Sequence, residues 1–386
     1  MRLSLSPLSK SKSNRKQAER ELEARLASPP PRNGRSRRRV AQEVGSGVAP
    51  EGSEGAVPEA GSHPYVADCS HPLNRVVPRF ATSDYITGER FVVGFCHNCR
   101  LHITTPAPGE AELARYYPSS YYGSGRRFNR IVEWLLNHLY SYRALHIEGR
   151  QRPGKVLDIG CGRGLLLSKL RERGWEPQGT ELSEEAAVYA RERLGLPVST
   201  CALQDCGFAD GEFDLVILWH VLEHLHAPRA ILQEVSRILK PGGVLLVAVP
   251  NFGSWEARWS GPGWFHLDVP RHLTHFTPHT LHDALDNAGL KLMSTNFFST
   301  EYDYFSFVQS AQNKLGFRHN YLYNLLRTRS AKVINAQGVT EQVGAAETAL
   351  VLASAFPLSA LSFFVTPVVA ALGRGATIAA YAIKPQ

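Results

Sequence analysis

Val156-Leu-Asp-Ile-Gly-Cys-Gly-Arg-Gly-Leu165 is the stretch that decides the fold of this 386-residue chain. A short apolar run leads into three glycines at alternate positions, Gly160, Gly162 and Gly164, and apolar leucines follow. The pattern predicts a buried strand, a tight turn and the start of a helix, because glycine lets the backbone bend sharply and lets a ligand come close. Free N–H groups at the start of that helix can meet a carboxylate or a phosphate, so we expect a nucleotide-like cofactor here.

The spacing of the glycines indicates which cofactor to expect. A dinucleotide fingerprint is G-x-G-x-x-G, whereas this chain has G-x-G-x-G preceded by Asp158. A second predicted strand ends at Glu181, whose carboxylate can accept hydrogen bonds from both hydroxyls of a ribose. These residues together resemble the class I S-adenosylmethionine (SAM) dependent methyltransferases, and a dehydrogenase is disfavoured.

The sequence downstream extends the resemblance. Residues 213–218 read as a strand, Leu239-Lys-Pro-Gly-Gly243 as a turn, and 243–249 as the next strand. The resemblance covers roughly residues 128–300 and the last strand. It implies an α/β, Rossmann-like seven-stranded sheet whose sixth and seventh strands pair as an antiparallel hairpin at the edge. The predicted strands are 155–159, 176–181, 197–201, 213–218, 243–249, 290–299 and 376–384, and the predicted helices are 165–174, 184–194, 229–239 and 278–289, with an amphipathic helix at 128–147.

The resemblance also implies a set of cofactor-binding residues: Asp158, Gly160, Gly162, Gly164, Glu181, Leu182, Leu203 and Trp219. One position departs from the family. Relatives often carry an aspartate after the third strand that binds the adenine amino group, and that place falls at Ala202-Leu203 here. We therefore expect backbone groups to hold the adenine, with Asp205 as a weaker substitute.

The positive charge of the chain is confined to its beginning. The chain carries 43 Lys and Arg against 35 Asp and Glu, but residues 1–40 hold 12 basic and 3 acidic residues, which leaves 31 and 32 for the remainder. A body of net charge −1 lacks the basic footprint of a nucleic-acid enzyme. Residues 1–62 are poor in large apolar residues, so a disordered basic tail is predicted.

Residues 63–125 are predicted to form a zinc-ribbon-like unit and a linker. Val92–Ile103 reads as a strand, a Cys96-x-x-Cys99 knuckle and a second strand. Tetrahedral Zn²⁺ needs four ligands. The relatives' first Cys-x-x-Cys pair is broken here, and Cys69 with His71 is the candidate replacement. Either these four residues hold a structural zinc ion, or the ribbon has lost its metal.

The methyltransferase domain is predicted to span residues 126–386, with an insertion at 302–372 before the last strand. Thr348–Gly373 contains no charged residue over 26 positions. Pro357 and Pro367 and the return of the last strand to the same sheet argue against a membrane span. We expect two short apolar helices that either pack as a lid or dip into one leaflet.

We expect a cytoplasmic protein, with contact to the inner face of the membrane through residues 348–373 as one alternative. No secretory signal follows the first basic residues. The six cysteines are scattered along the chain, and disulfides are not expected in a reducing compartment.

Two clusters carry the candidate catalytic groups. His220, Glu223 and His224 follow the fourth strand, where i, i+3, i+4 spacing would share one helix face. His224 is the first candidate for a general base and His220 belongs to the same cluster. Glu223 and His224 also resemble two of the Glu, Glu and His metal ligands of some ubiquinone-biosynthesis O-methyltransferases, with His220 in place of the first Glu. His272, after the fifth strand, is the second candidate for a base.

The neighbourhood of His272 suggests the acceptor. Arg271 and an aromatic loop of residues 252–265 suit a large acceptor with apolar or sugar faces and an anionic group. We predict a SAM-dependent methyltransferase acting on a glycan, glycolipid or lipid-linked sugar. The alternatives are a small-molecule O-methyltransferase of the quinone type and a catalytically silent SAM-binding scaffold.

Overall fold

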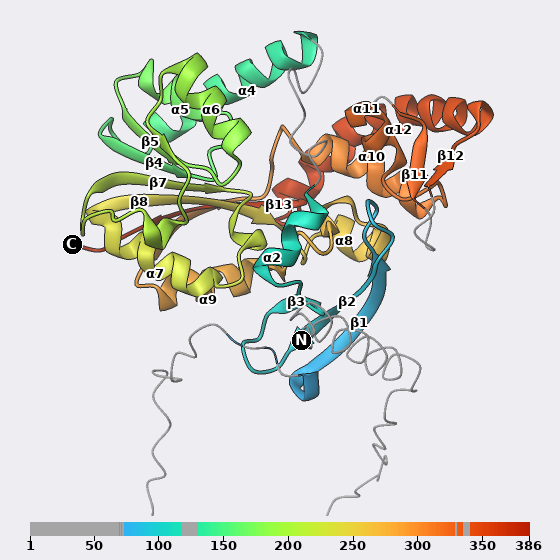
Figure 1. Cartoon of the computed structure of the whole chain (residues 1–386), viewed down its shortest axis with the longest axis horizontal. Coiled ribbons are helices and arrows are strands. Elements are labelled where there is room, and N and C mark those ends of the chain that lie inside the picture. Colours follow the sequence, from blue (N-terminus) through green and yellow to red (C-terminus); the bar gives the residue numbers. More distant parts are fainter. Residues whose placement is uncertain (1–68, 70, 72, 118–129, 329, 335–339) are drawn as a thin grey trace, which may run out of the picture.

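The structure is a computed structural model that describes residues 69, 71, 73–117, 130–328, 330–334 and 340–386. Its centre is a seven-stranded sheet in the order β10-β13-β8-β7-β4-β5-β6. Figure 1 shows the central strands β4, β5, β7, β8 and β13 of this sheet. The chain therefore has the predicted α/β, Rossmann-like methyltransferase sheet. The prediction of a disordered tail over residues 1–62 lies outside the described residues.

The strands of this sheet agree with the sequence analysis to within a few residues. Pairs β4–β5, β4–β7, β5–β6 and β7–β8 are parallel, whereas β13 is antiparallel to both β8 and β10. The predicted antiparallel hairpin at the edge is thus confirmed. The strands are β4 (Lys155–Ile159), β5 (Glu176–Thr180), β6 (Val198–Ser199), β7 (Phe213–Trp219), β8 (Leu239–Pro250), β10 (Lys291–Asn296) and β13 (Thr377–Ile383).

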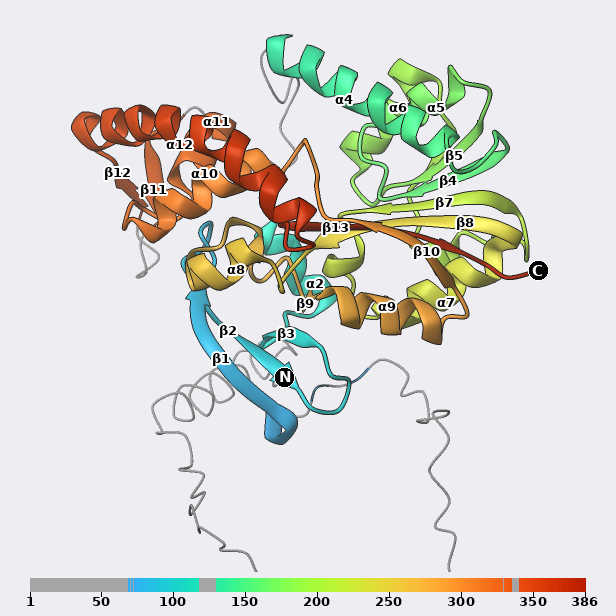
Figure 2. The same cartoon turned by 180° about the vertical axis from the view of Figure 1, so that it is seen from behind.

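Helices cover both faces of the sheet (Figures 1 and 2). On one face lie α4 (Arg130–Glu148), α5 (Leu165–Arg171) and α6 (Glu184–Leu194), and on the other α7 (Pro228–Ile238) and α9 (Pro278–Asn287). Two apolar clusters fill the layers between helices and sheet. Strands β4, β7 and β8 are buried on both faces, which explains why they read as continuous apolar runs.

The N-terminal unit is a second sheet. Its last strand, β9, comes from the part of the chain that forms the seven-stranded sheet. Its order is β1 (Val76–Ser83), β2 (Arg90–Cys96), β3 (His102–Thr105) and β9 (Thr274–His275). The predicted strand, knuckle and strand are confirmed as β2, residues 96–99 and β3. The sequence analysis did not predict β9, because two residues carry no periodicity.

Short helical segments complete the chain outside the insertion. They are η1 (Leu73–Arg75), α2 (Glu110–Leu113), η2 (Ala114–Tyr116), η3 (Leu203–Asp205), η4 (Leu222–His224), α8 (Trp255–Ser260), η5 (Gly261–Gly263) and η6 (Phe265–Leu267).

The insertion before β13 corrects one prediction. It comprises α10 (Asp303–Lys314), α11 (Tyr321–Thr328), the hairpin β11 (Lys332–Ile334) and β12 (Thr340–Gln342), and α12 (Ala345–Ala371). The apolar stretch is one helix of 27 residues with Pro357 and Pro367 inside it, not two short helices. A proline removes one backbone donor, but no Gly, Asn or Asp stands beside either proline to end the helix.

A disulfide corrects a second expectation. Cys201 and Cys206 are bonded, with their Cα atoms 5.6 Å apart. The intervening 3₁₀ turn η3 brings together two cysteines that the sequence shows only as five residues apart.

A buried carboxyl group attaches the insertion to the sheet. Glu256 in α8 is buried and accepts hydrogen bonds from Ser306 and Ser310 of α10. Burial raises the pKa of Glu256 to about 8, and the nearby charge of Asp303 adds to this, although the two serine hydrogen bonds oppose it. The folded protein therefore keeps a proton on Glu256 that the unfolded chain releases near pH 4.

Stability should therefore fall as the pH rises from about 5 to 8, because the folded state binds more protons than the unfolded state over that range. Asp303, whose pKa burial raises to about 7, contributes with the same sign. Glu256→Gln cannot ionise, so we expect its melting temperature to fall less across this range, by roughly 5 °C. Thermal unfolding from pH 5 to 8 checks this, with the exposed Glu185→Gln as control. Equal pH dependence in both variants would contradict it.

Candidate active site

The glycine turn after β4 leaves room for a ligand. Gly160, Gly162 and Gly164 all have positive φ angles, of 70°, 55° and 72°. A Cβ atom on Gly164 would come within 2.7 Å of Leu196, so this glycine is needed for close packing. At Gly162 no atom lies within 4 Å of the Cβ position, so the backbone there faces open space.

Glu181 joins this turn to the end of β5. Its carboxylate accepts hydrogen bonds from the N–H groups of Gly162 (2.9 Å) and Ser183 (2.8 Å). Next to it, Leu182 is 71% exposed, which is unusual for leucine, while Leu203 is buried in η3. The predicted ribose and adenine residues thus lie at the carboxyl ends of neighbouring parallel strands, where this fold binds its ligands.

Asp158 and Trp219 share a neighbour that the sequence analysis missed. Burial raises the pKa of Asp158 to about 7, although the positive charge of Arg143 opposes this. The Arg143 guanidinium lies 3.4 Å from the centre of the Trp219 ring and pairs with Glu301. The sequence offered one signal for this contact, a single arginine in the second half of the predicted helix at 128–147. Whether that side chain reaches the site depends on how α4 packs on the sheet.

His220 is the most constrained residue of the candidate site. It follows β7 directly and has a φ of 54°, a conformation that is uncommon for non-glycine residues and is one of the strained conformations that cluster at active sites. Its Nδ1 lies 3.1 Å from the buried Glu223 carboxylate, whereas its Nε2 is buried and has no hydrogen-bond partner among the described residues. Because a carboxylate accepts, Nδ1 carries the proton of the neutral ring and Nε2 is left as an acceptor.

Glu223 is ionised despite its burial. Desolvation raises the pKa, but the hydrogen bond from His220 and the charges of His220, His224 and His272 lower it to about 2. The ionised group can orient His220 and stabilise its protonated form, as the third member of a catalytic triad does.

His224 and His272 are oriented by backbone carbonyls. The Nδ1 of His224 lies 3.0 Å from the Arg271 carbonyl and 3.0 Å from the Tyr117 hydroxyl. The Nδ1 of His272 lies 2.8 Å from the carbonyl of His266, and burial followed by the charge of His224 lowers the pKa of His272 to about 4. The structure thus brings all three predicted catalytic histidines around Glu223. The predicted shared helix face does not form, because η4 begins at Leu222 and His220 lies before it with a positive φ.

Glu223, His224 and His272 could also hold a divalent cation. Their ligand atoms lie within 4.8 Å of one another, and Glu223 Oε2 is buried without a partner. Two histidines and one carboxylate form a recognised set of ligands for a divalent metal. His220 stands where the resembled metal-binding enzymes have their first Glu. Its ring is hydrogen-bonded to Glu223 instead.

Two interpretations of the second cluster are wrong. Arg271 is fully buried and paired with Asp84 and Asp268, so it does not face an anionic acceptor. In the aromatic loop, Trp255 and Trp259 stack on Phe307 of α10, and Trp264 is buried. This loop therefore attaches the insertion. The ring centres near His220 include those of Tyr302 (4.6 Å), Trp219 (6.1 Å) and His266 (6.2 Å).

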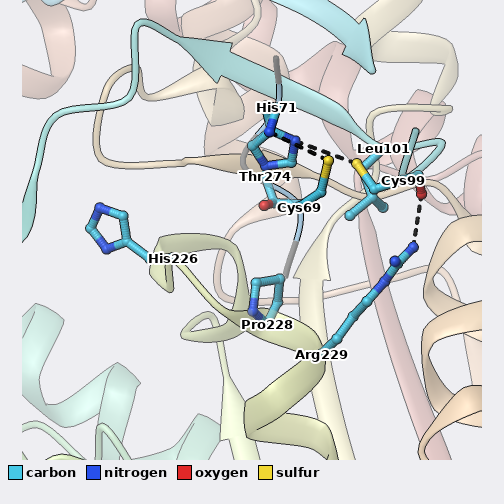
Figure 3. A pocket seen from close by; sticks show the side chains of 8 residues that line it. All are labelled: Cys69, His71, Cys99, Leu101, His226, Pro228, Arg229 and Thr274. Atoms are coloured by element: carbon cyan, nitrogen blue, oxygen red, sulfur yellow. Dashed lines mark hydrogen bonds between the residues drawn. The ribbon is translucent and has the colours of Figure 1, made fainter. Parts of the chain in front are cut away.

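The four predicted metal ligands of the N-terminal unit meet at one point, and Figure 3 shows three of them, Cys69, His71 and Cys99. The ligand atoms of Cys69, His71, Cys96 and Cys99 lie within 4.8 Å of one another. Burial, and the nearby thiols of Cys96 and Cys69, raise the pKa of Cys99 to about 12, although a backbone hydrogen bond opposes this. The reacting groups around Glu223 belong to a separate cluster.

Part of this chain is similar to known proteins. Residues 128–295 match a family model described as a methyltransferase domain. The ubiquinone biosynthesis O-methyltransferase of Azoarcus sp. (strain BH72) is 33% identical over 152 residues, which cover 36% of this chain and 65% of that protein. The enzyme of the same name from Idiomarina loihiensis is 31% identical over 154 residues, covering 37% and 63%. The match thus spans less than two thirds of these relatives.

Solved structures are more distant. A SAM-dependent methyltransferase from Thermotoga maritima, described as a possible histamine N-methyltransferase, is 18% identical with a TM-score of 0.39. The match covers 66% of this chain and 95% of that one. At that TM-score the strand order, rather than this likeness, supports the fold assignment.

Glu181→Ala should abolish tight binding of SAM, because the substitution removes the acceptor for two ribose hydroxyls and frees the Gly162 turn. We expect the affinity to fall about 100-fold in calorimetric titration. The exposed Glu184→Ala in the same segment is the matched control and should bind as the unaltered protein does. Retention of tight binding by Glu181→Ala would remove Glu181 from the cofactor site.

Proposed function

Because residues 128–295 carry a class I methyltransferase domain, we propose that this protein transfers a methyl group from SAM to the hydroxyl of a small phenol or quinol. When bound, SAM supplies an already activated methyl group. Asp158, Glu181 and the glycine turn would hold it, and the open space at Gly162 fits its approach. The observation that carries the proposal is the His220–Glu223 pair with its unpartnered Nε2.

This pair suits a phenolic acceptor better than a sugar. A phenol has a pKa near 10, as tyrosine does, whereas an aliphatic hydroxyl resembles water, whose pKa is about 15.7. A neutral imidazole can therefore remove the phenolic proton at modest cost. Tyr302 and His266 beside His220 offer aromatic faces to a flat ring.

The names of the relatives support the same acceptor class. The sequence analysis placed a glycan or lipid-linked sugar first and the quinone type second. The ubiquinone-biosynthesis relatives reverse that order. A silent scaffold is disfavoured because the candidate base and the cofactor residues are all present.

We also propose that α12 lies on the inner face of a membrane, where an apolar acceptor would be found. Among the described residues, Ala345–Ala371 is the one helix long and apolar enough to span a bilayer, and its most apolar window is only 11% buried. Phe356, Phe363 and Phe364 are 83%, 62% and 75% exposed. Tyr321 binds Thr348 near one end of α12 and β13 follows the other end, so one body holds both ends. The helix would lie in the plane of one leaflet.

Two further parts of the proposal concern metals and location. We propose that Cys69, His71, Cys96 and Cys99 hold a structural zinc ion away from the reacting groups. The four free cysteines, Cys69, Cys96, Cys99 and Cys161, support a cytoplasmic location. The Cys201–Cys206 disulfide is evidence against it, because disulfides are rare in reducing compartments.

His220→Asn should lower kcat for a catechol or a short-chain hydroxylated quinol about 10²- to 10⁴-fold, because it removes the general base. Asparagine tolerates a positive φ, so the backbone is preserved. The affinity for SAM should not change, and the exposed His279→Asn is the matched control. The loss should shrink for a nitrocatechol or at high pH, where the acceptor ionises without help.

The same assay separates the alternatives. Methylation of a monosaccharide but of no phenol would overturn the acceptor class. A loss in His220→Asn that is the same for every phenol at every pH would make His220 structural. If turnover requires added Mg²⁺, then Glu223 acts as a metal ligand and not as the group that orients His220.

Membrane contact is tested with Phe356→Asp combined with Phe364→Asp. The unaltered protein should sediment with phospholipid vesicles, and the double variant should remain largely in the supernatant, since each charge opposes burial in lipid. Met293→Asp, on β10 and 48% exposed, is the control and should still sediment. Equal sedimentation of all three proteins, or of none, would refute the membrane role of α12.

A further inference from the structure

We infer that the cluster of Cys69, His71, Cys96 and Cys99 is a closed tetrahedral zinc site that braces the acceptor side of the candidate active site. The statement that this side of the site binds the acceptor rests on the proposed function. The zinc site itself rests on the geometry of the cluster, and the brace on the hydrogen bonds that link it to β9.

The distances between the ligand atoms fit a tetrahedron around zinc. Zn–S bonds of about 2.3 Å and Zn–N bonds of about 2.05 Å place two sulfurs about 3.8 Å apart, and a sulfur and a nitrogen about 3.5 Å apart. In the structure, the sulfurs of Cys69 and Cys96 are 3.8 Å apart, and the Cys99 sulfur is 3.5 Å from His71 Nδ1. These two pairs share no atom, so they form opposite edges of one tetrahedron. All six edges lie within 4.8 Å.

The backbone around the ligands is bent in the manner of a metal knuckle. The N–H of Arg100 donates to the Cys96 carbonyl at 2.8 Å, which closes a turn over the sulfurs. The N–H of His71 donates to the Cys69 sulfur at 3.3 Å, so the backbone of this segment wraps around the sulfur. His71 and Arg100 have φ angles of 48° and 61°, so two non-glycine residues keep a costly conformation at one cluster. A bound metal would explain why both residues keep a positive φ angle.

The ligand set implies a structural role for the metal. Three sulfurs and one nitrogen complete the coordination of Zn²⁺ and leave no position for water or substrate. Cys96 and Cys99 are buried at 0% and 4% exposure and belong to the main apolar cluster of the sheet. The metal would therefore tie the segment before β1 to the core.

Hydrogen bonds carry this restraint to the candidate active site. The Cys99 carbonyl accepts a hydrogen bond from Arg229, near the start of α7, at 2.8 Å (Figure 3). Downstream of the knuckle, β3 pairs with β9. Thr104 in β3 donates its hydroxyl to the His272 carbonyl at 2.6 Å and its N–H to the Leu273 carbonyl at 2.9 Å. Loss of the metal should thus loosen the segment that carries His272.

Metal analysis of the full-length protein tests the site. The protein as purified, or after reduction and reconstitution with Zn²⁺ alone, should contain close to one zinc ion per chain. Cobalt(II) in its place should show the intense thiolate charge-transfer and tetrahedral ligand-field absorption bands. His71→Gln and Cys99→Ser should lose most of the metal. His97→Gln, on an exposed residue of the same knuckle, is the matched control and should retain it.

Hydrogen–deuterium exchange tests the brace. In the metal-depleted protein and in His71→Gln, we expect amides of residues 102–105 and 272–275 to exchange at least about tenfold faster, because local opening becomes easier. Amides of β4 and β5 should exchange as before, and the affinity for SAM should not change. If SAM binding is normal, KM for the phenol should rise more than kcat falls.

The outcomes distinguish the two proposals. A protein that takes up neither zinc nor cobalt, or whose thiol titration reveals a Cys69–Cys96 disulfide, refutes the zinc site. Unchanged exchange at 272–275 after metal loss refutes the brace while leaving the zinc site. A protein that binds zinc but neither SAM nor any phenol refutes the proposed function and leaves the zinc site standing.

Discussion

The fully buried guanidinium of Arg271 is the interaction on which the acceptor side of the molecule depends. Arg271 donates to Asp84 in the turn after β1, to Asp268 beside it, and to the carbonyl of Tyr116. A buried cation without these partners would cost several kcal/mol, so the N-terminal sheet and the loop after β8 must meet where they do. The Arg271 carbonyl in turn fixes the ring of His224.

Glu223 is a second residue on which the site depends, because its one carboxylate lies close to three histidine rings. His220 binds it at 3.1 Å, and the His272 ring lies 4.0 Å away. This arrangement places an ionised group, a constrained imidazole and an unpartnered ring nitrogen at the carboxyl end of β7. The same group would fit either a base-catalysed transfer or a cation, and the His220 contact favours the former, since it already uses one carboxylate oxygen.

The insertion, residues 302–372, extends the α/β architecture without interrupting the seven-stranded sheet. Its helices attach through Glu256, through the stacked Trp255, Trp259 and Phe307, and through Asp303, which accepts a hydrogen bond from Thr377 of β13. These contacts hold α10 firmly and leave most of α12 exposed. An apolar helix that is held at both ends but covered along so little of its length is suited to a lipid surface.

The sequence by itself determined the seven-stranded α/β sheet and the antiparallel hairpin at its edge. Long apolar runs, glycine spacing and proline turns are local signals, and β4, α6, β7 and β13 follow them closely. Cys69, His71, Cys96 and Cys99 were also identified from the sequence, because a knuckle is a local pattern.

Only the tertiary structure decided how distant residues combine. It assigned Arg271 to the interior instead of to an acceptor, paired Ile103 of β3 with Thr274, 171 positions away, and joined Cys201 to Cys206. It also brought Arg143 near Asp158 and left His220 outside the helical turn that carries His224. The reason is physical: buried charges and edge strands take whatever partner the packed chain brings within reach, and sequence spacing does not encode that distance.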